Sequence, residues 1–133
     1  MFCTVIEGQG KGAHFIEGST GELEPVVGFI PFHGTLNLRN VDTRGLQSEN
    51  IEELGGGECK GVVVHLCRIN GIIAGTTVPI IEGYPEEITE VIAPVKLRKL
   101  FDLNEEDEVV FSPRDGVWKP NGSIVKHENI NLF

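Results

Sequence analysis

The sequence is short of positive charge and of long apolar runs, and each shortage excludes a class of protein. Its 133 residues hold 20 Asp and Glu against 11 Lys and Arg, a formal net charge of −9. Non-specific nucleic-acid binding is excluded, because its affinity comes from Lys and Arg side chains that displace counterions from phosphates. No run of about 18 apolar residues suggests a membrane span, and the N-terminus has no signal-peptide pattern. We expect one domain over residues 1–133 and a cytoplasmic location.

Cysteine is scarce, and histidine shows no metal-binding pattern. The chain has three cysteines, Cys3, Cys59 and Cys67, so any disulfide scheme leaves one unpaired, and none forms a CxxC pair. The four histidines are scattered, without an HExxH motif. We expect the cysteines to be buried structural thiols, as free cysteines usually are. A metal site built from histidines is not expected.

Glycine is plentiful, with 17 residues, and several lie where strands should turn. Asn70-Gly71 separates two β-branched apolar runs, residues 61–69 and 72–81, which predicts a hairpin with a type I′ turn. Further short strands are predicted at residues 1–7, 34–41, 89–93, 107–111 and 122–133. Helices are predicted at residues 94–103, with Pro94 at the first helical position, and at residues 46–54. Many short strands and few helices predict a mainly β protein, a compact β-barrel with one or two short helices.

Two glycine-containing stretches admit both a structural and a ligand-binding interpretation. "GQGKG" places Gly8, Gly10 and Gly12 at alternate positions, which suits either a plain turn or a loop whose N–H groups approach phosphate oxygens. It matches neither a Walker loop nor a Rossmann turn. In "HGTLNLRN", alternation puts Thr35 and Asn37 on one face of a strand. Those side chains are either surface positions or oxygen ligands for a hard metal ion or a phosphate.

The stretch "EVIAPVKLRK" joins Glu90 to a local cluster of positive charge. Lys96, Arg98 and Lys99 follow Pro94, and a helix start beside an arginine suits an anion. The alternative is a solvated basic helix face. Arg98 is the strongest candidate of the cluster, because its planar guanidinium makes bidentate contacts with phosphate. No spacing in the chain indicates a Ser-His-Asp or Cys-His nucleophile.

Taken together, these segments resemble the archaeal-type CTP-dependent riboflavin kinases. The resemblance rests on "GQGKGAHF", "VGFIPFHGTLNL", "INGIIAGTTVP" and "YPEEITEVIAPVKLRKLFDLNEEDEVVF", in that order, and covers residues 7–111. It implies a cradle-loop β-barrel that transfers the γ-phosphate of CTP to the 5′-hydroxyl of riboflavin, giving FMN and CDP. It also implies Mg²⁺ as the cofactor, with no nucleic-acid or membrane partner. Some family members fuse this domain to a DNA-binding winged-helix segment, and we expect a free-standing enzyme here.

The resemblance assigns roles to individual residues. It implies a metal site at Thr35 and Asn37, with Asn37 also counted among the catalytic residues, and it places Gly83 and Glu90 at the flavin. As a hypothesis, Glu90 is also the base that takes the proton of the attacking hydroxyl. The residues implied to contact the nucleotide are Gly8, Gln9, Gly10, Lys11, Gly12, Ala13, Val95, Lys96, Leu97 and Arg98.

Three positions depart from the family pattern. Lys11 stands where the family loop carries an acidic residue, which adds a charge favourable to phosphate. Gly83 stands where a threonine commonly precedes the tyrosine, which removes a hydroxyl near the flavin. Glu106 replaces a turn glycine, and we expect this to change only the geometry of the loop. The departures keep two alternatives open: a non-catalytic flavin- or nucleotide-binding barrel, and a kinase for another acceptor.

Overall fold

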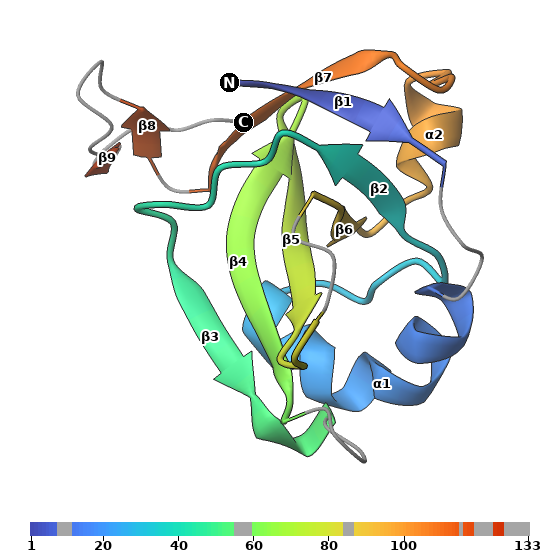
Figure 1. Cartoon of the computed structure of the whole chain (residues 1–133), viewed down its shortest axis with the longest axis vertical. Coiled ribbons are helices and arrows are strands. Elements are labelled where there is room, and N and C mark those ends of the chain that lie inside the picture. The colour runs from blue at the N-terminus through green and yellow to red at the C-terminus, as the bar shows by residue number, and fades with distance from the viewer. Residues whose placement is uncertain (8–11, 55–59, 84–86, 115, 119–123, 127–133) are drawn as a thin grey trace.

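Six antiparallel strands close into a barrel (Figure 1). The computed structural model describes residues 1–7, 12–54, 60–83, 87–114, 116–118 and 124–126. The barrel strands are β1 (Phe2–Ile6), β2 (Leu36–Arg39), β4 (Val62–Ile69), β5 (Ile72–Pro79), β6 (Thr89–Ile92) and β7 (Glu108–Pro113). They neighbour one another in the order β4-β5-β6-β2-β1-β7, and pairing of β4 with β7 closes the ring. The mainly β barrel predicted from the sequence is confirmed.

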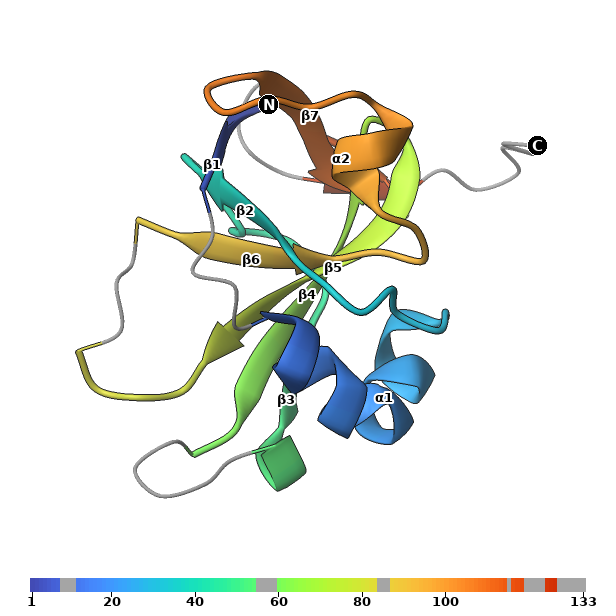
Figure 2. The same cartoon turned by 90° about the vertical axis from the view of Figure 1, so that its right-hand side faces the viewer.

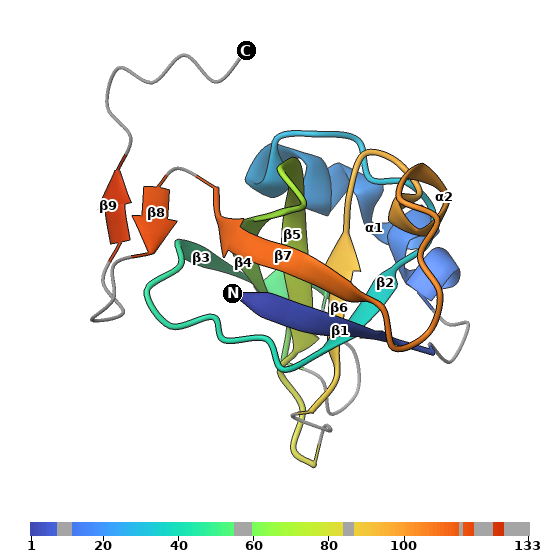
Figure 3. The same ribbon diagram turned by 90° about the horizontal axis from the view of Figure 1, so that it is seen from above.

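The remaining elements lie outside the ring of strands. Strand β3 (Ser48–Ile51) extends the sheet beside β4, and the short 3-10 helix η1 (Glu52–Leu54) follows it. Residues 46–54 were predicted to be helical, and this was wrong for β3, because pairing with β4 satisfies the backbone groups that a helix would otherwise pair. Strands β8 (Gly116–Trp118) and β9 (Ile124–Lys126) form a separate hairpin beyond the end of β7 (Figure 3).

The hairpin between β4 and β5 confirms the prediction at Asn70-Gly71. Ile69 pairs with Ile72, so the connection has two residues. Asn70 has φ 48° and Gly71 has φ 86°, and positive φ at both central residues defines a type I′ turn. The Asn70 side chain adds a link to β7, where its Oδ1 accepts a hydrogen bond of 2.8 Å from the Val110 N–H.

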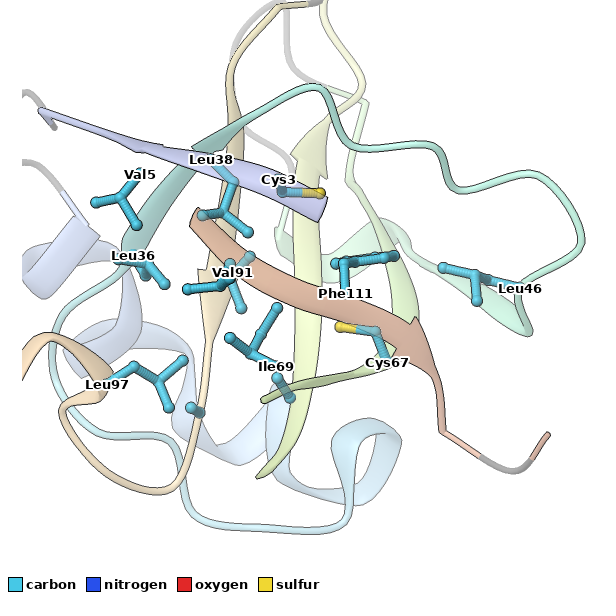
Figure 4. Close-up of a cluster of buried hydrophobic side chains, with 13 residues drawn as sticks. Cys3, Val5, Leu36, Leu38, Leu46, Cys67, Ile69, Val91, Leu97 and Phe111 are labelled. Carbon is cyan, nitrogen blue, oxygen red and sulfur yellow. The ribbon is translucent and has the colours of Figure 1, made fainter. Parts of the chain in front are cut away.

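Alternate residues of the strands fill the interior of the barrel (Figure 4). In Figure 4, Val5, Leu38, Ile69 and Phe111 point into this core from four different strands. Cys3 and Cys67 belong to the same cluster, are fully buried and form no disulfide, as predicted. Burial raises the pKa of Cys3 to about 11 and that of Cys67 to about 12, so both thiols are protonated at neutral pH. Cys59 lies outside the described residues.

A second apolar cluster lies between the outer face of the sheet and helix α1 (Gly12–Val27) (Figure 2). Leu23 and Val27 of the helix pack with Val64 of β4 and Ile92 of β6. Gly75 permits this close packing, since a Cβ there would lie 3.1 Å from Val27 Cγ1. Helix α1 was not predicted as an element. No helix among the described residues is long and apolar enough to cross a membrane.

Helix α2 (Leu97–Leu100) is much shorter than the predicted helix at residues 94–103. Lys96 is its N-cap residue, with φ −74° and ψ 100°, so Pro94 lies outside the helix rather than at its first position. Leu97 is buried in the barrel core, whereas Leu100 is exposed. Phe101 and Leu103, which follow α2, also pack against the core, so the segment is held by apolar contacts without forming a long helix.

Candidate functional site

One row of side chains crosses the sheet beside the start of the glycine-rich segment. Ile6, the last residue of β1, pairs with Asn37 of β2. Asn37 pairs with Glu90 of β6, and Glu90 pairs with Thr77 of β5. Residues directly opposite one another in antiparallel strands share a face, with Cβ atoms about 4.5–5.5 Å apart. The amide, the carboxylate and the hydroxyl therefore stand next to one another.

This row faces outward, away from the barrel core. Leu36, Leu38 and Val91, the chain neighbours of Asn37 and Glu90, all belong to the interior cluster. Because side chains alternate along a strand, Asn37 and Glu90 point to the opposite side. That is also the side of Ile92 and helix α1. The candidate site is therefore on the outer wall of the barrel, on the face that α1 partly covers.

Burial affects the polar groups of the row unequally. Asn37 is 6% exposed and Thr77 is 2% exposed, while Glu90 is half-buried. Partial burial removes water from the Glu90 carboxylate and raises its pKa above the usual range. Within the described ranges, no hydrogen bond to the Glu90 carboxylate is formed. The carboxylate is thus a hydrogen-bond acceptor available to a ligand.

Thr35 lies one residue before β2, on the other side of Leu36 from Asn37. The buried Leu36 points inward between them, so the extended chain turns Thr35 and Asn37 outward. Hydroxyl, amide and carboxylate oxygens are the donors that Mg²⁺ prefers. Thr35 and Asn37 therefore form a pair of neutral oxygen donors that fits this ion.

A pocket of about 60 Å³ opens beside Thr35. Two segments form its walls, one around Phe32 to Leu36 and the other around Val91 to Arg98. The Phe32 N–H donates a hydrogen bond of 2.8 Å to the Ala93 carbonyl and ties the two segments together. All four residues of the stretch predicted to contact the nucleotide, Val95, Lys96, Leu97 and Arg98, line this pocket. Phe32 also lines it, and the sequence did not single out that residue.

Arg98 connects this pocket to the end of β1. Its Nη2 donates a hydrogen bond of 2.9 Å to the carbonyl of Ile6, the end of β1. The sequence predicted an anion site at a helix start here. Because α2 has only four residues, its dipole adds little, and the positive charge at this place comes from the side chains of Lys96, Arg98 and Lys99.

Some predicted residues can be placed only in part. Gly8, Gln9, Gly10 and Lys11 lie outside the described residues, while Gly12 and Ala13 are the first residues of α1. Gly83 is exposed, with φ 81°. Glu106 has φ 71°, so this glutamate adopts the left-handed backbone that a turn glycine favours. Its carboxylate accepts a hydrogen bond of 2.9 Å from Arg39.

The sequence did not identify Thr77. Thr77 lies beside Glu90 because of the register in which β5 pairs with β6. That register cannot be predicted from the sequence, because the connection between the two strands, residues 80–88, is long. The Asn70-Gly71 turn aligns β5 with β4, but carries no information about β6.

Comparison with known proteins identifies one family that covers the barrel and the candidate site. Residues 5–112 match the family model CTP-dep_RFKase, described as a domain of unknown function, DUF120. Proteins named riboflavin kinase from three archaea match over most of the chain. The relative from Methanoregula boonei is 38% identical, that from Archaeoglobus fulgidus 37% and that from Methanosarcina mazei 33%.

The alignments cover 79% or 80% of this chain and between 50% and 53% of those three relatives. The chain thus spans about half the length of the curated relatives it matches. The family model covers residues 5–112, which include most of the barrel, the row at Asn37 and Glu90, and the pocket beside Thr35. The chain belongs to the CTP-dependent riboflavin kinase family.

Proposed function

We propose that the protein transfers the γ-phosphate of CTP to the 5′-hydroxyl of riboflavin, producing FMN and CDP. The observation that carries the proposal is the juxtaposition of Asn37 and Glu90 on the outer wall, beside the end of β1. Thr35 links this row to the pocket lined by Lys96 and Arg98. The names of the relatives support riboflavin as the acceptor, and the family name supports CTP as the donor.

The nucleotide would lie between the pocket and the glycine-rich segment. The pocket of about 60 Å³ would accommodate one part of the nucleotide, with the phosphates extending toward Thr35. The side chains of Lys96 and Lys99 are exposed there, and positive charge counters the repulsion between phosphates and an acidic protein. Gly8 to Gly12, which follow β1, would approach the phosphates with their backbone N–H groups.

Mg²⁺ would be held by Thr35 and Asn37. Bound to the nucleotide, the ion neutralises phosphate charge and stabilises the charge of the transition state. Both protein groups are neutral oxygen donors, and Mg²⁺ usually completes its octahedral shell with water and substrate phosphates.

Glu90 would receive the proton in the chemical step. The riboflavin 5′-oxygen forms a bond to the γ-phosphorus, and the bond from that phosphorus to the bridging oxygen of CDP breaks. The hydroxyl proton passes to the Glu90 carboxylate and from there to water. Burial makes this carboxylate a stronger base than an exposed one, which suits it to the task.

Product formation tests the reaction directly. Purified protein is incubated with riboflavin, Mg²⁺ and either CTP or ATP, and FMN is followed by chromatography. We expect FMN with CTP and little with ATP. FMN with ATP alone would contradict the choice of donor. Riboflavin binding without FMN under either nucleotide would instead support a non-catalytic flavin-binding barrel, the reading that Gly83 keeps open.

The role of Glu90 is tested with a matched pair of substitutions. Glu90→Gln should lower kcat about a hundredfold or more, because the amide cannot accept the proton. Glu49→Gln is the control. Glu49 is exposed on the edge strand β3, opposite Val64, which in turn lies opposite Thr77. That variant should keep the wild-type kcat. A normal kcat with a raised KM for riboflavin in Glu90→Gln would show that Glu90 only binds riboflavin and is not the base.

A further inference from the structure

Thr77 carries a buried hydroxyl for which the fold provides no partner. The residue is 2% exposed, and within the part of the chain that the structure describes its Oγ1 forms no hydrogen bond. Such an unpaired group destabilises the folded state, whereas a methyl group of similar shape does not. The Thr77 hydroxyl is therefore available to a neighbouring group or a ligand that comes within reach.

The nearest functional group across the sheet is the Glu90 carboxylate. Thr77 and Glu90 are directly opposite partners on β5 and β6, so their side chains leave the sheet on the same face. Glu90 has Asn37 as its partner on the other side. The carboxylate thus lies between an amide and a hydroxyl, and rotation of the flexible Glu90 side chain would bring its oxygens within hydrogen-bond distance of that hydroxyl.

Thr76 provides an internal comparison. It is fully buried, and among the described residues its hydroxyl also has no partner. Its strand partners are His65 and Val91, and Val91 belongs to the core cluster, so Thr76 points into the barrel. Two adjacent threonines therefore share burial and an unpaired hydroxyl, but only Thr77 faces the candidate site.

We propose that Thr77 is a positioning residue for the acceptor alcohol. When substrate displaces water from Glu90, the Thr77 hydroxyl donates a hydrogen bond to the Glu90 carboxylate and holds it toward the attacking 5′-hydroxyl. A hydrogen bond to an ionised acceptor is about twice as strong as one between neutral groups, which suits it to fixing an orientation. The inference rests on the proposed function, because it assigns Thr77 a role through Glu90.

Matched valine substitutions test the proposal. Thr77→Val should lower kcat about tenfold, equivalent to about 1.4 kcal/mol. The KM values for riboflavin and CTP should change less than about twofold, because binding contacts remain. Thr76→Val should leave kcat unchanged, and Thr77→Ser should restore most of the wild-type rate. Both valine variants should unfold at urea concentrations no lower than the wild type, so lost folding does not explain lost activity.

The combination with Glu90→Gln separates this proposal from the one on which it rests. In the Glu90→Gln background, Thr77→Val should have little further effect, since the carboxylate that it orients is gone. A normal kcat for Thr77→Val, or an equal loss for Thr76→Val, overturns the role of Thr77 while Glu90→Gln remains defective. Wild-type kinetics for Glu90→Gln, or no FMN from the wild type, overturns both proposals.

Discussion

Asn70 has two roles, one in the turn between β4 and β5 and one in a hydrogen bond to β7, and only the first could be predicted from the sequence. The Asn-Gly pair predicted the type I′ turn, because both residues tolerate positive φ. The sequence did not indicate that Asn70 Oδ1 would accept a hydrogen bond from Val110 of β7. That contact depends on β4 and β7 meeting to close the barrel.

The two roles of Asn70 can be measured separately. Asn70→Gly keeps the positive φ and loses the contact with Val110, so we expect it to lower the free energy of unfolding by about 1 kcal/mol. Asn70→Ala loses the contact and also strains the backbone, because an alanine with positive φ costs about 1–2 kcal/mol. The alanine variant should therefore be the less stable of the two. Urea denaturation of both gives the comparison, and equal stability of Asn70→Gly and the wild type would show that the Val110 bond contributes nothing.

The residues of the candidate site were predictable to different degrees. Alternation in "GTLNL" places Thr35 and Asn37 on one face, and the structure confirms that the buried Leu36 lies between them. The pairing of Asn37 with Glu90 joins positions 53 residues apart by number, and no local pattern encodes that register. Thr77 and Phe32 were not predicted for the same reason. Each belongs to the candidate site only through a neighbour on a different segment of the chain.

At the scale of elements, local signals predicted the strands better than the helices. Each barrel strand overlaps a predicted segment, and only β7 runs beyond its segment, to Pro113. Helix α1 was missed because it contains Gly18 and Gly21 as well as Pro25 in its last turn. Its stability comes from packing of Leu23 and Val27 on the sheet, and tertiary packing of this kind overrides low helix propensity. One usable signal was Gly28, which follows the helix with φ 81° and donates to the Glu24 carbonyl.

Arg114 fastens this helix to the barrel. Its guanidinium donates hydrogen bonds to the carbonyl of Val27, the last residue of α1, and to the carbonyl of Ala74 in β5. It also lies 5.8 Å from the centre of the Phe29 ring. A planar guanidinium can reach two carbonyls from one side chain, which a lysine ammonium does only with poorer geometry.

Arg114→Lys should therefore loosen the end of α1 against the sheet. We expect the free energy of unfolding to fall by about 2 kcal/mol, because partly buried hydrogen bonds to a charged group contribute about 1.5–3 kcal/mol. Hydrogen exchange should accelerate in residues 23–28. Arg44→Lys is the control, since Arg44 makes its ion pair with Asp42 at the exposed surface, and it should leave both measurements unchanged. Similar losses from the two substitutions would refute the fastening role of Arg114.

At the scale of the whole molecule, the net charge of −9 works against binding of a polyphosphate. Lys96 and Arg98 line the pocket and Lys99 follows them in the chain, and Arg98 already donates to the Ile6 carbonyl. A bound divalent cation would offset the remaining repulsion. The proposed protein ligands, Thr35 and Asn37, are neutral, so they attract Mg²⁺ only slightly without the phosphates. We therefore expect binding of metal and nucleotide to be strongly coupled.

Thermal unfolding measures this coupling, because a ligand raises the midpoint in proportion to its binding to the folded state. Mg²⁺ alone should leave the midpoint almost unchanged, CDP alone should raise it slightly, and the two together should raise it by more than the sum of the separate shifts. Asn37→Ala should abolish the extra shift that Mg²⁺ and CDP give together and keep the shift with CDP alone. Asn50 is an exposed asparagine on β3, and Asn50→Ala should behave as the wild type. An equal shift from Mg²⁺ with and without CDP would mean that the protein holds the metal by itself, which two neutral oxygens could not account for.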